Sequence, residues 1–253
     1  MDLPGCRMVV LALNLFELPM PSSKRIFVLV AAYNEALRLG ETLRSLTEGQ
    51  PYPVVVVDDG STDSTPTIAS GFERVVVLQH ARNLGQGAAL QTGIDYVLNQ
   101  GAQLVVTFDA DGQHSPADIA MLIEPILKEQ ADIVLGSRFL VRNPQIPLGR
   151  WLLLKCGIAF TRFTLGLRIT DTHNGLRALS RTAASRIRIT QRRMAHASEI
   201  LHQVRRLKLR YVEVPVSVQY SVETLKKGQS FWGAATILKD LATGPRPPAK
   251  DPA

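Results

Sequence analysis

Residues 53–63 read PVVVVDDGSTD, an apolar run that ends in two aspartates and continues into small polar residues. Four consecutive valines with no polar residue between them are typical of a parallel strand covered on both faces. Ser, Thr and Asp directly after the run are typical of a helix start. This stretch therefore predicts a strand over 53–60 followed by a helix, which is the repeating unit of an α/β fold.

The same alternation of strand and helix extends to both sides of this stretch. Further strands are expected at 26–33, 75–80, 104–111 and 131–138, and helices at 36–46, 87–101, 116–129 and 197–207. A strand at 211–220 and a helix at 231–242 are also expected. The pattern predicts a Rossmann-like, mostly parallel sheet with helices on both faces and a ligand crevice at the carboxyl ends of the strands.

Composition excludes several classes of protein. The chain has 253 residues, of which 45% are hydrophobic and 20% charged, and it contains two cysteines. This excludes a disulfide scaffold and a mostly disordered chain, and it favours a reducing, cytoplasmic location. No uncharged apolar run approaches the roughly 20 residues that a transmembrane helix needs.

Charge divides the chain into two parts. Residues 26–137 hold 5 Lys or Arg and 14 Asp or Glu, whereas residues 138–210 hold 16 Lys or Arg and 2 Asp or Glu. Such asymmetry fits nucleic acid, a membrane surface, or a phosphorylated ligand between the two parts. The apolar segment 146–169 carries scattered basic residues and is expected to be either a core-packed helix or an interfacial amphipathic helix.

Residues 109–114, DADGQH, follow directly on the strand LVVTF. Asp109 and Asp111 at a strand end are costly to bury together without a cation. With the amide oxygen of Gln113 they form an oxygen donor set that suits Mg²⁺ or Mn²⁺. We therefore expect a divalent metal here, held partly by substrate phosphates.

Two other strand ends bear on nucleotide binding. Asp58 and Asp59 can accept hydrogen bonds from a base and from ribose hydroxyls. Gly85 and Gly87 open a helix in a pattern that approximates a dinucleotide fingerprint, but Leu90 stands where that fingerprint needs Gly or Ala. An NAD(P)-binding oxidoreductase is therefore only a remote alternative.

The motifs AAYNE (31–35), VVVVDDGSTD (54–63), NLGQGAAL (83–90), DADGQH (109–114) and GSR (136–138) together resemble family 2 glycosyltransferases of the GT-A fold. DTHNGLR (171–177) and VEVPV (212–216) are similar to the branch of dolichol- and polyprenyl-phosphate mannosyl- and glucosyltransferases. The sequence departs from that branch in the DTHNGLR motif, where Asn174 and Leu176 replace a small hydroxyl residue and an aromatic residue. The resemblance implies inverting transfer from a UDP- or GDP-sugar by one in-line displacement.

The resemblance also implies roles for individual residues. Asp109, Asp111 and Gln113 hold the metal, and Arg138 and Arg177 contact phosphate. The donor-binding residues are Ala32, Tyr33, Asn34, Glu35, Asp58, Asp59, Gly87 and Asp109. The catalytic set is Asp111, Arg138, Glu199 and Asp171.

Two classes of acceptor are compatible with the sequence, a sugar hydroxyl and a lipid phosphate. A sugar hydroxyl needs a general base, for which Glu199 and Asp171 are the candidates. A lipid phosphate, with a second pKa of about 6, is already ionised and needs only cations. The many cations of 138–210 favour a polyprenyl phosphate met at the membrane surface, with the protein peripheral on its cytoplasmic face.

The expected organisation is one GT-A domain between two tails. Residues 26–138 form the nucleotide-sugar half and 139–242 the acceptor half, while 1–25 and 243–253 are expected to be poorly structured. A nucleic-acid-binding module is disfavoured because aromatic residues are not interleaved with the basic clusters.

Overall fold

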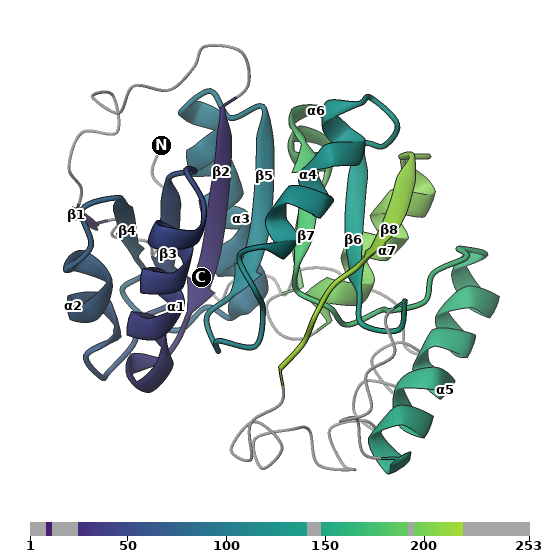
Figure 1. The fold of residues 1–253 in the computed structure, drawn as a ribbon, viewed down its shortest axis with the longest axis horizontal. Helices are drawn as coiled ribbons and strands as arrows, with labels where there is room; N and C mark the ends of the chain where they lie inside the picture. Colours follow the sequence, from purple (N-terminus) through teal and green to yellow (C-terminus); the bar gives the residue numbers. More distant parts are fainter. Residues whose placement is uncertain (1–8, 12–24, 141–147, 192–194, 220–253) are drawn as a thin grey trace, which may run out of the picture.

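An eight-stranded sheet runs through the molecule in the order β1-β4-β3-β2-β5-β7-β6-β8 (Figure 1). The structure is a computed structural model and describes residues 9–11, 25–140, 148–191 and 195–219. The strands are β1 (Val9–Leu11), β2 (Ile26–Ala32), β3 (Val54–Asp58), β4 (Val75–Gln79), β5 (Leu104–Asp109), β6 (Ile133–Ser137), β7 (Arg177–Ser180) and β8 (Tyr211–Pro215). Strands β2 to β5 pair in parallel, as do β6 and β8, whereas β1 and β7 are antiparallel to their neighbours.

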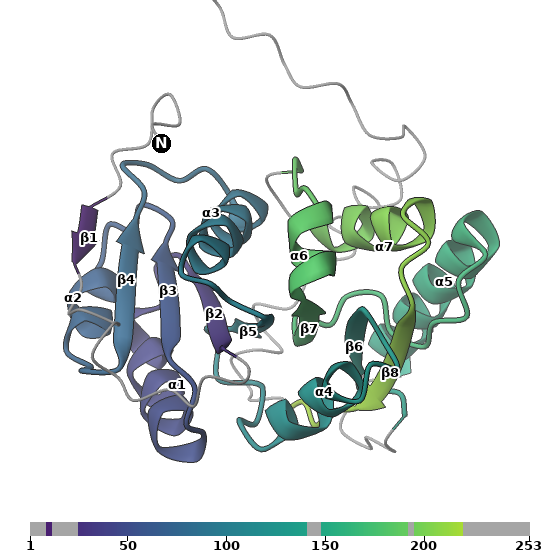
Figure 2. The same cartoon turned by 90° about the horizontal axis from the view of Figure 1, so that it is seen from above.

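Helices cover both faces of this sheet (Figure 2). They are α1 (Ala36–Gly49), α2 (Thr65–Ser70), α3 (Gln86–Asn99), α4 (Asp118–Leu127), α5 (Leu148–Leu165), α6 (Arg181–Arg186) and α7 (His196–Arg206). Helices α3, α6 and α7 lie on one face and α1 and α4 on the other, while α5 lies at the β8 side of the molecule. None of the helices within the described ranges is long and apolar enough to cross a membrane.

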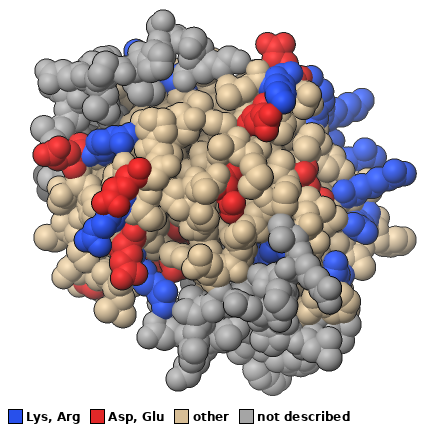
Figure 3. Space-filling model, viewed as in Figure 1, with Lys and Arg blue, Asp and Glu red and all other residues tan. Residues whose placement is uncertain are grey.

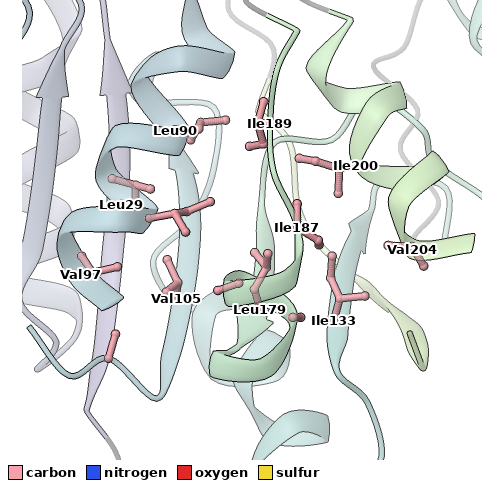
Figure 4. Packing of buried hydrophobic residues seen from close by; sticks show 14 of the residues in the cluster. Leu29, Leu90, Val97, Val105, Ile133, Leu179, Ile187, Ile189, Ile200 and Val204 are labelled. Atoms are coloured by element: carbon pink, nitrogen blue, oxygen red, sulfur yellow. The ribbon is translucent and has the colours of Figure 1, made fainter. Parts of the chain in front are cut away.

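Strand side chains alternate between two apolar clusters, because successive residues of a strand point to opposite faces. Leu29, Val55 and Val105 pack with α3, α6 and α7, and Figure 4 shows Ile187, Ile189 and Ile200 facing Leu90 across this cluster. Val28, Val56 and Val106 pack with α1 and α4 on the other face. Burial on both faces explains why these strands are continuous runs of β-branched residues.

The mostly parallel α/β fold predicted from the sequence is confirmed, and all five strands expected between 26 and 138 are present. Strand β7 and helix α6 were not expected, and β7 lies between β5 and β6. Within the segment 1–25, which is expected to be a tail, Val9–Leu11 forms a short strand that pairs with β4. The helix expected at 231–242 and the tail 243–253 lie outside the described residues.

Helix α5 combines features of both interpretations of segment 146–169. Ile158 and Leu165 are buried, so part of the helix packs against the protein. Trp151 and Phe163 are 41% and 91% exposed, and Lys155 Nζ lies 4.3 Å from the ring centroid of Phe139. The helix therefore presents aromatic and cationic side chains outward at the margin of the fold.

Candidate functional site

The carboxyl ends of the parallel strands meet at one edge of the sheet, the lower edge in Figure 1. Asp58, Asp109 and Ser137 are the last residues of β3, β5 and β6. Because β7 is antiparallel, its first residue, Arg177, lies at this same edge and pairs with Thr107. The antiparallel insertion thus adds an arginine to the acidic edge that the sequence predicted.

Asp109 lies against several cationic or protonatable groups. Its Oδ2 is 3.2 Å from His114 Nε2, and 28% of its side chain is exposed. Burial alone would raise the pKa of Asp109, but the hydrogen bond and charge of His114 and the charges of His196 and Arg177 lower this pKa overall. Asp109 is consequently ionised at neutral pH.

Asp111 has the opposite electrostatic environment. Burial and the neighbouring charge of Asp109 raise its pKa. Its Oδ1 accepts from Gln113 N at 3.0 Å and its Oδ2 from Gln113 Nε2 at 2.7 Å, across a turn in which Gly112 has φ +72°. A cation between the two carboxylates would relieve the repulsion that raises this pKa.

The donor set at this strand end consists of oxygen atoms. No group of three or more His, Cys, Asp or Glu in the described part of the chain is arranged to hold a metal. Asp109, Asp111 and the Gln113 amide offer oxygen atoms that suit a hard divalent cation, whose remaining ligands would have to come from substrate or water. Such partial coordination is typical of Mg²⁺ and Mn²⁺ sites that bind phosphates.

Asp58 and Asp59 are both buried, and their contacts differ. Asp58 accepts from Ser61 N at 3.3 Å, which closes the turn after β3. Asp59 Oδ1 lies 2.7 Å from His80 Nδ1, and the two Asp59 oxygens accept from Leu84 N at 2.9 Å and Gly85 N at 2.7 Å. Asp59 therefore ties the loop before α3 to the end of β3.

The loop after β2 is fixed to the loop after β3. Asn34, at φ 53°, receives a hydrogen bond on Oδ1 from Thr62 N and donates its own N–H to Ser61 Oγ, each at 2.9 Å. Glu35 N donates to Thr65 Oγ1 at 2.9 Å, and Ala32 O accepts from Asp59 N at 2.8 Å.

Tyr33 directly follows β2, and Gly87 lies in the first turn of α3. The Tyr33 side chain is 43% exposed beside the linked loops. Gly87 opens α3, and an ideal Cβ there would lie 3.1 Å from the carbonyl carbon of Gln191 and 3.1 Å from His196 Cβ. A side chain at Gly87 would collide with the segment before α7, so the close approach requires glycine.

Arg138 and Asp171 form a buried ion pair. Arg138 Nε donates to Asp171 Oδ2 at 2.6 Å, Arg138 N donates to the same oxygen at 3.2 Å, and Arg138 Nη2 donates to His173 O at 3.4 Å. The side chains are 8% and 1% exposed. Asp171 is thus committed to orienting Arg138.

Arg177 is buried, and within the described ranges one of its nitrogens has no hydrogen-bond partner. Its Nε donates to Asn174 O at 3.0 Å and its Nη2 to Thr172 O at 3.4 Å, whereas Nη1 has no partner among the described residues. Burial lowers the pKa of Arg177 to about 10, against the charges of Asp109 and Asp171, so the group stays cationic at neutral pH.

A small cavity separates Arg177 from α7. Its volume is about 20 Å³, room for roughly one water molecule, and Asp109, Gly175 and His196 help to line it. His196 was not singled out from the sequence, since a histidine at a helix start carries no motif. Its position results from the close approach of the start of α7 to Gly87 at the start of α3.

Glu199 has a different environment from the other predicted residues. It lies in the first turn of α7 and accepts from Thr190 N at 3.0 Å, Thr190 Oγ1 at 2.5 Å and Gln191 N at 2.9 Å. These bonds attach the segment before α7 to the helix. The structure therefore brings Asp109, Asp111 and Arg177 to one edge and uses Glu199 to hold a loop.

Glu213 was also missed from the sequence. It lies on β8, and its carboxylate accepts from the N–H groups of Thr170 and Asp171 at 2.8 and 3.1 Å. Burial raises its pKa, although these backbone donors act against the rise.

Comparison with known proteins shows the family to which the chain belongs. Residues 27–188 match the family described as glycosyl transferase family 2. The UDP-N-acetylglucosamine–dolichyl-phosphate N-acetylglucosaminyltransferase of Methanococcus voltae is 32% identical over 82% of this chain and 90% of its own. The undecaprenyl-phosphate mannosyltransferase of Micrococcus luteus is 32% identical over 84% of this chain and 91% of its own.

Solved structures support the fold. Glucosyl-3-phosphoglycerate synthase from Mycobacterium tuberculosis, in complex with Mn²⁺, UDP-glucose and phosphoglyceric acid, superimposes with a TM-score of 0.64 at 19% identity, covering 87% of this chain and 79% of the other. The GT-A fold expected from the sequence is confirmed. The chain belongs to glycosyltransferase family 2 and is a glycosyltransferase.

Proposed function

We propose that the protein transfers a sugar, with inversion, from a UDP- or GDP-sugar to a polyprenyl phosphate in a metal-dependent reaction. The observation that carries this proposal is the meeting of two carboxylates, Asp109 and Asp111, with two buried arginines, Arg138 and Arg177, at one edge of the sheet. Relatives that are 32% identical over most of their length are named for transfer to dolichyl or undecaprenyl phosphate.

The donor lies over the ends of β2, β3 and β5 in this proposal. The exposed Tyr33 ring is suited to stack on the base. Glu35 offers a carboxylate to the base or ribose, while the buried Asp58 and Asp59 act through the turn and the loop that they hold. Ala32, Asn34 and Gly87 shape the backbone against which the nucleotide packs.

Asp109, Asp111 and Gln113 would hold Mg²⁺ or Mn²⁺ in this proposal, and the bound ion would supply positive charge for the departing nucleoside diphosphate. A related fold was solved with Mn²⁺ and UDP-glucose. His114 keeps the Asp109 carboxylate ionised and oriented through its 3.2 Å contact. Arg177, itself buried, adds fixed positive charge near this carboxylate.

The acceptor phosphate needs no base in this scheme. One of its oxygens attacks the anomeric carbon while the bond to the nucleoside diphosphate breaks, and no proton has to be removed because the phosphate is ionised. Asp171 and Glu199, the two candidate bases, already accept hydrogen bonds from Arg138 and from the 190–191 segment. Arg138 and Arg177 supply the cations that an anionic acceptor requires.

The lipid acceptor implies work at a bilayer surface, and we propose the cytoplasmic one. Figure 3 shows Lys and Arg gathered along the right edge, over the side where α5, α7 and β8 lie. The exposed aromatic side chains of α5, Trp151 and Phe163, lie at the same side. Aromatic and cationic groups together are suited to the headgroup region of an anionic membrane.

A matrix of donors and acceptors tests the proposal. UDP-glucose, UDP-N-acetylglucosamine and GDP-mannose are each incubated with Mn²⁺ or Mg²⁺ and with polyprenyl phosphate, polyprenol or a free sugar. Products are identified by mass spectrometry. The proposal expects a sugar–phosphate–lipid product from one donor and none from polyprenol; a glycosylated free sugar as the sole product would refute it.

A further inference from the structure

The segment 169–173, which carries Asp171, is attached to strands on two sides. Thr170 Oγ1 lies 2.6 Å from Ser137 Oγ at the end of β6. On the other side, both Glu213 oxygens accept from Thr170 N at 2.8 Å, and one of them accepts from Asp171 N at 3.1 Å. The backbone around Asp171 is therefore fixed by a carboxylate from β8, a strand that contributes no residue to the predicted site.

Glu213 connects to Arg138 through one intermediate residue. Asp171 donates its N–H to Glu213 and accepts from Arg138 Nε at 2.6 Å. The same Asp171 oxygen accepts from Arg138 N at 3.2 Å. A shift of Asp171 would therefore change the direction of the Arg138 side chain as well as the backbone after β6.

Placing Glu213 here is electrostatically unfavourable. The carboxylate is partly buried, and Asp171 carries like charge nearby, so the pKa of Glu213 is raised. Burial of a carboxylate is costly unless its oxygens receive hydrogen bonds, which Thr170 and Asp171 supply here. A partly buried carboxylate thus fixes the peptide N–H groups of Thr170 and Asp171. Residues that hold a functional side chain in place are expected to make such contacts.

We propose that Glu213 is a positioning residue for Arg138, acting through Asp171, and thereby sets the geometry of the acceptor side of the site. This inference rests on the proposed function in that it assigns Arg138 to the acceptor phosphate. Glu213 itself touches neither substrate nor metal. Its removal should weaken productive binding of the acceptor and leave donor and metal binding unchanged.

The conservative substitution Glu213→Gln tests this role. Glutamine keeps the side-chain length and one oxygen, but its NH2 group is a donor and replaces the second oxygen, which accepts from Thr170 N. The negative charge that strengthens the bonds from Thr170 N and Asp171 N is also lost. Glu213→Asp provides a second variant that keeps the charge but shortens the reach. Misplacement of a catalytic group by about 1 Å can cost on the order of 100-fold in rate, so a fall of about 10- to 100-fold in kcat/KM for the acceptor is expected.

Asp132→Asn is the matched control. Asp132 Oδ2 accepts from Arg210 N at 2.8 Å, so this carboxylate also fixes backbone beside the β6–β8 pair. Asp132 precedes the first pair, Ile133 with Tyr211, whereas Glu213 pairs with Leu135 in the middle of the ladder, and the site lies beyond the last pair, Ser137 with Pro215. A general loss of sheet stability would affect both variants alike, whereas a positioning role affects only Glu213→Gln.

Three readouts separate the possible outcomes: KM and kcat for polyprenyl phosphate, Kd for UDP with Mn²⁺, and the ¹H–¹⁵N resonance of Arg138 Nε, assigned with Arg138→Lys. Support requires a changed Arg138 resonance and a raised acceptor KM in Glu213→Gln, with donor Kd within about twofold of wild type and Asp132→Asn unaffected. An unchanged resonance, or equal effects on donor and acceptor, overturns the proposal.

Failure of the proposed function gives a different result. In that case the wild-type protein transfers no sugar to polyprenyl phosphate with any donor. The resonance still reports whether Glu213 orients Arg138: a shift in Glu213→Gln retains the positioning role with another acceptor, and no shift refutes it.

Discussion

Replacing Gly175 by alanine should displace the carboxylate of Asp109 while leaving the backbone conformation allowed. An ideal Cβ on Gly175 would lie 2.5 Å from Cγ of Asp109. The φ of Gly175 is not positive, so alanine can adopt the same backbone conformation. The effect of the substitution is therefore due to contact with Asp109.

The size of the displacement follows from this contact. Carbon atoms pack at about 3.5–4.0 Å, so Asp109 or residue 175 must move by about 1 Å. The backbone of Gly175 is tied to β5, because its carbonyl accepts from Thr107 Oγ1 at 2.6 Å. We therefore expect Asp109 to move, with a loss of roughly 100-fold in kcat and about 1–3 kcal/mol of stability from overpacking.

The assay compares Gly175→Ala with Gly157→Ala, each measured for sugar transfer, for Mn²⁺ binding by titration and for thermal unfolding. An alanine Cβ at Gly157, in α5, would meet nothing within 4 Å. Gly157→Ala should keep its activity and gain about 0.5–1 kcal/mol, because alanine is the better helix former. If Gly175→Ala has the same kcat and Mn²⁺ affinity as the wild type, Asp109 does not need its present position, and the prediction is wrong.

Three further outcomes are expected. Glu199→Gln should keep kcat within about threefold, since glutamine can still accept from Thr190, whereas removing a general base costs about 100- to 10,000-fold and alters the pH–rate profile. Asp111→Asn should lower Mn²⁺ affinity in a direct titration and reduce transfer by about 100-fold or more, and unchanged Mn²⁺ binding would contradict its assignment as a ligand. The hydrogen bond from Arg210 lowers the pKa of Asp132 below 3.8, so its stabilising contribution is present above that pH and lost as pH falls through the lower folded value. Wild type and Asp132→Asn should thus converge in unfolding free energy in acid, which urea titrations at several pH values would check.

The parallel half of the fold could be predicted because its strands are apolar on both faces. Runs such as VVVV at 54–57 have few alternatives to a doubly covered strand. Strand β7 could not be predicted in this way, because RALS at 177–180 is short and includes Arg177 and Ser180. It is a strand because β5 and β6 pair with it on both sides, a tertiary effect that outweighs local propensity.

The candidate site likewise contains residues that local sequence predicts and contacts that it does not. Asp109 and Asp111 could be predicted because they follow a strand end directly in the sequence. The ion pair of Arg138 with Asp171 joins residues 33 positions apart, and the contact of Glu213 with Thr170 spans 43 positions. Spacing along the chain carries no signal for such contacts, so the sequence left Asp171 open as a base where the structure binds it to Arg138.

A competition between two acceptors tests most directly whether the acceptor is a lipid phosphate or a sugar hydroxyl. Wild-type protein is given its preferred nucleotide-sugar, Mn²⁺, polyprenyl phosphate and an equimolar sugar acceptor with free hydroxyl groups, and the products are separated and weighed by mass spectrometry. We predict that the sugar is found in a lipid-linked sugar monophosphate, and that this product is lost when Arg138 is replaced by alanine. Sugar found in the hydroxyl acceptor, with none in the lipid, would show that the acceptor is not a lipid phosphate.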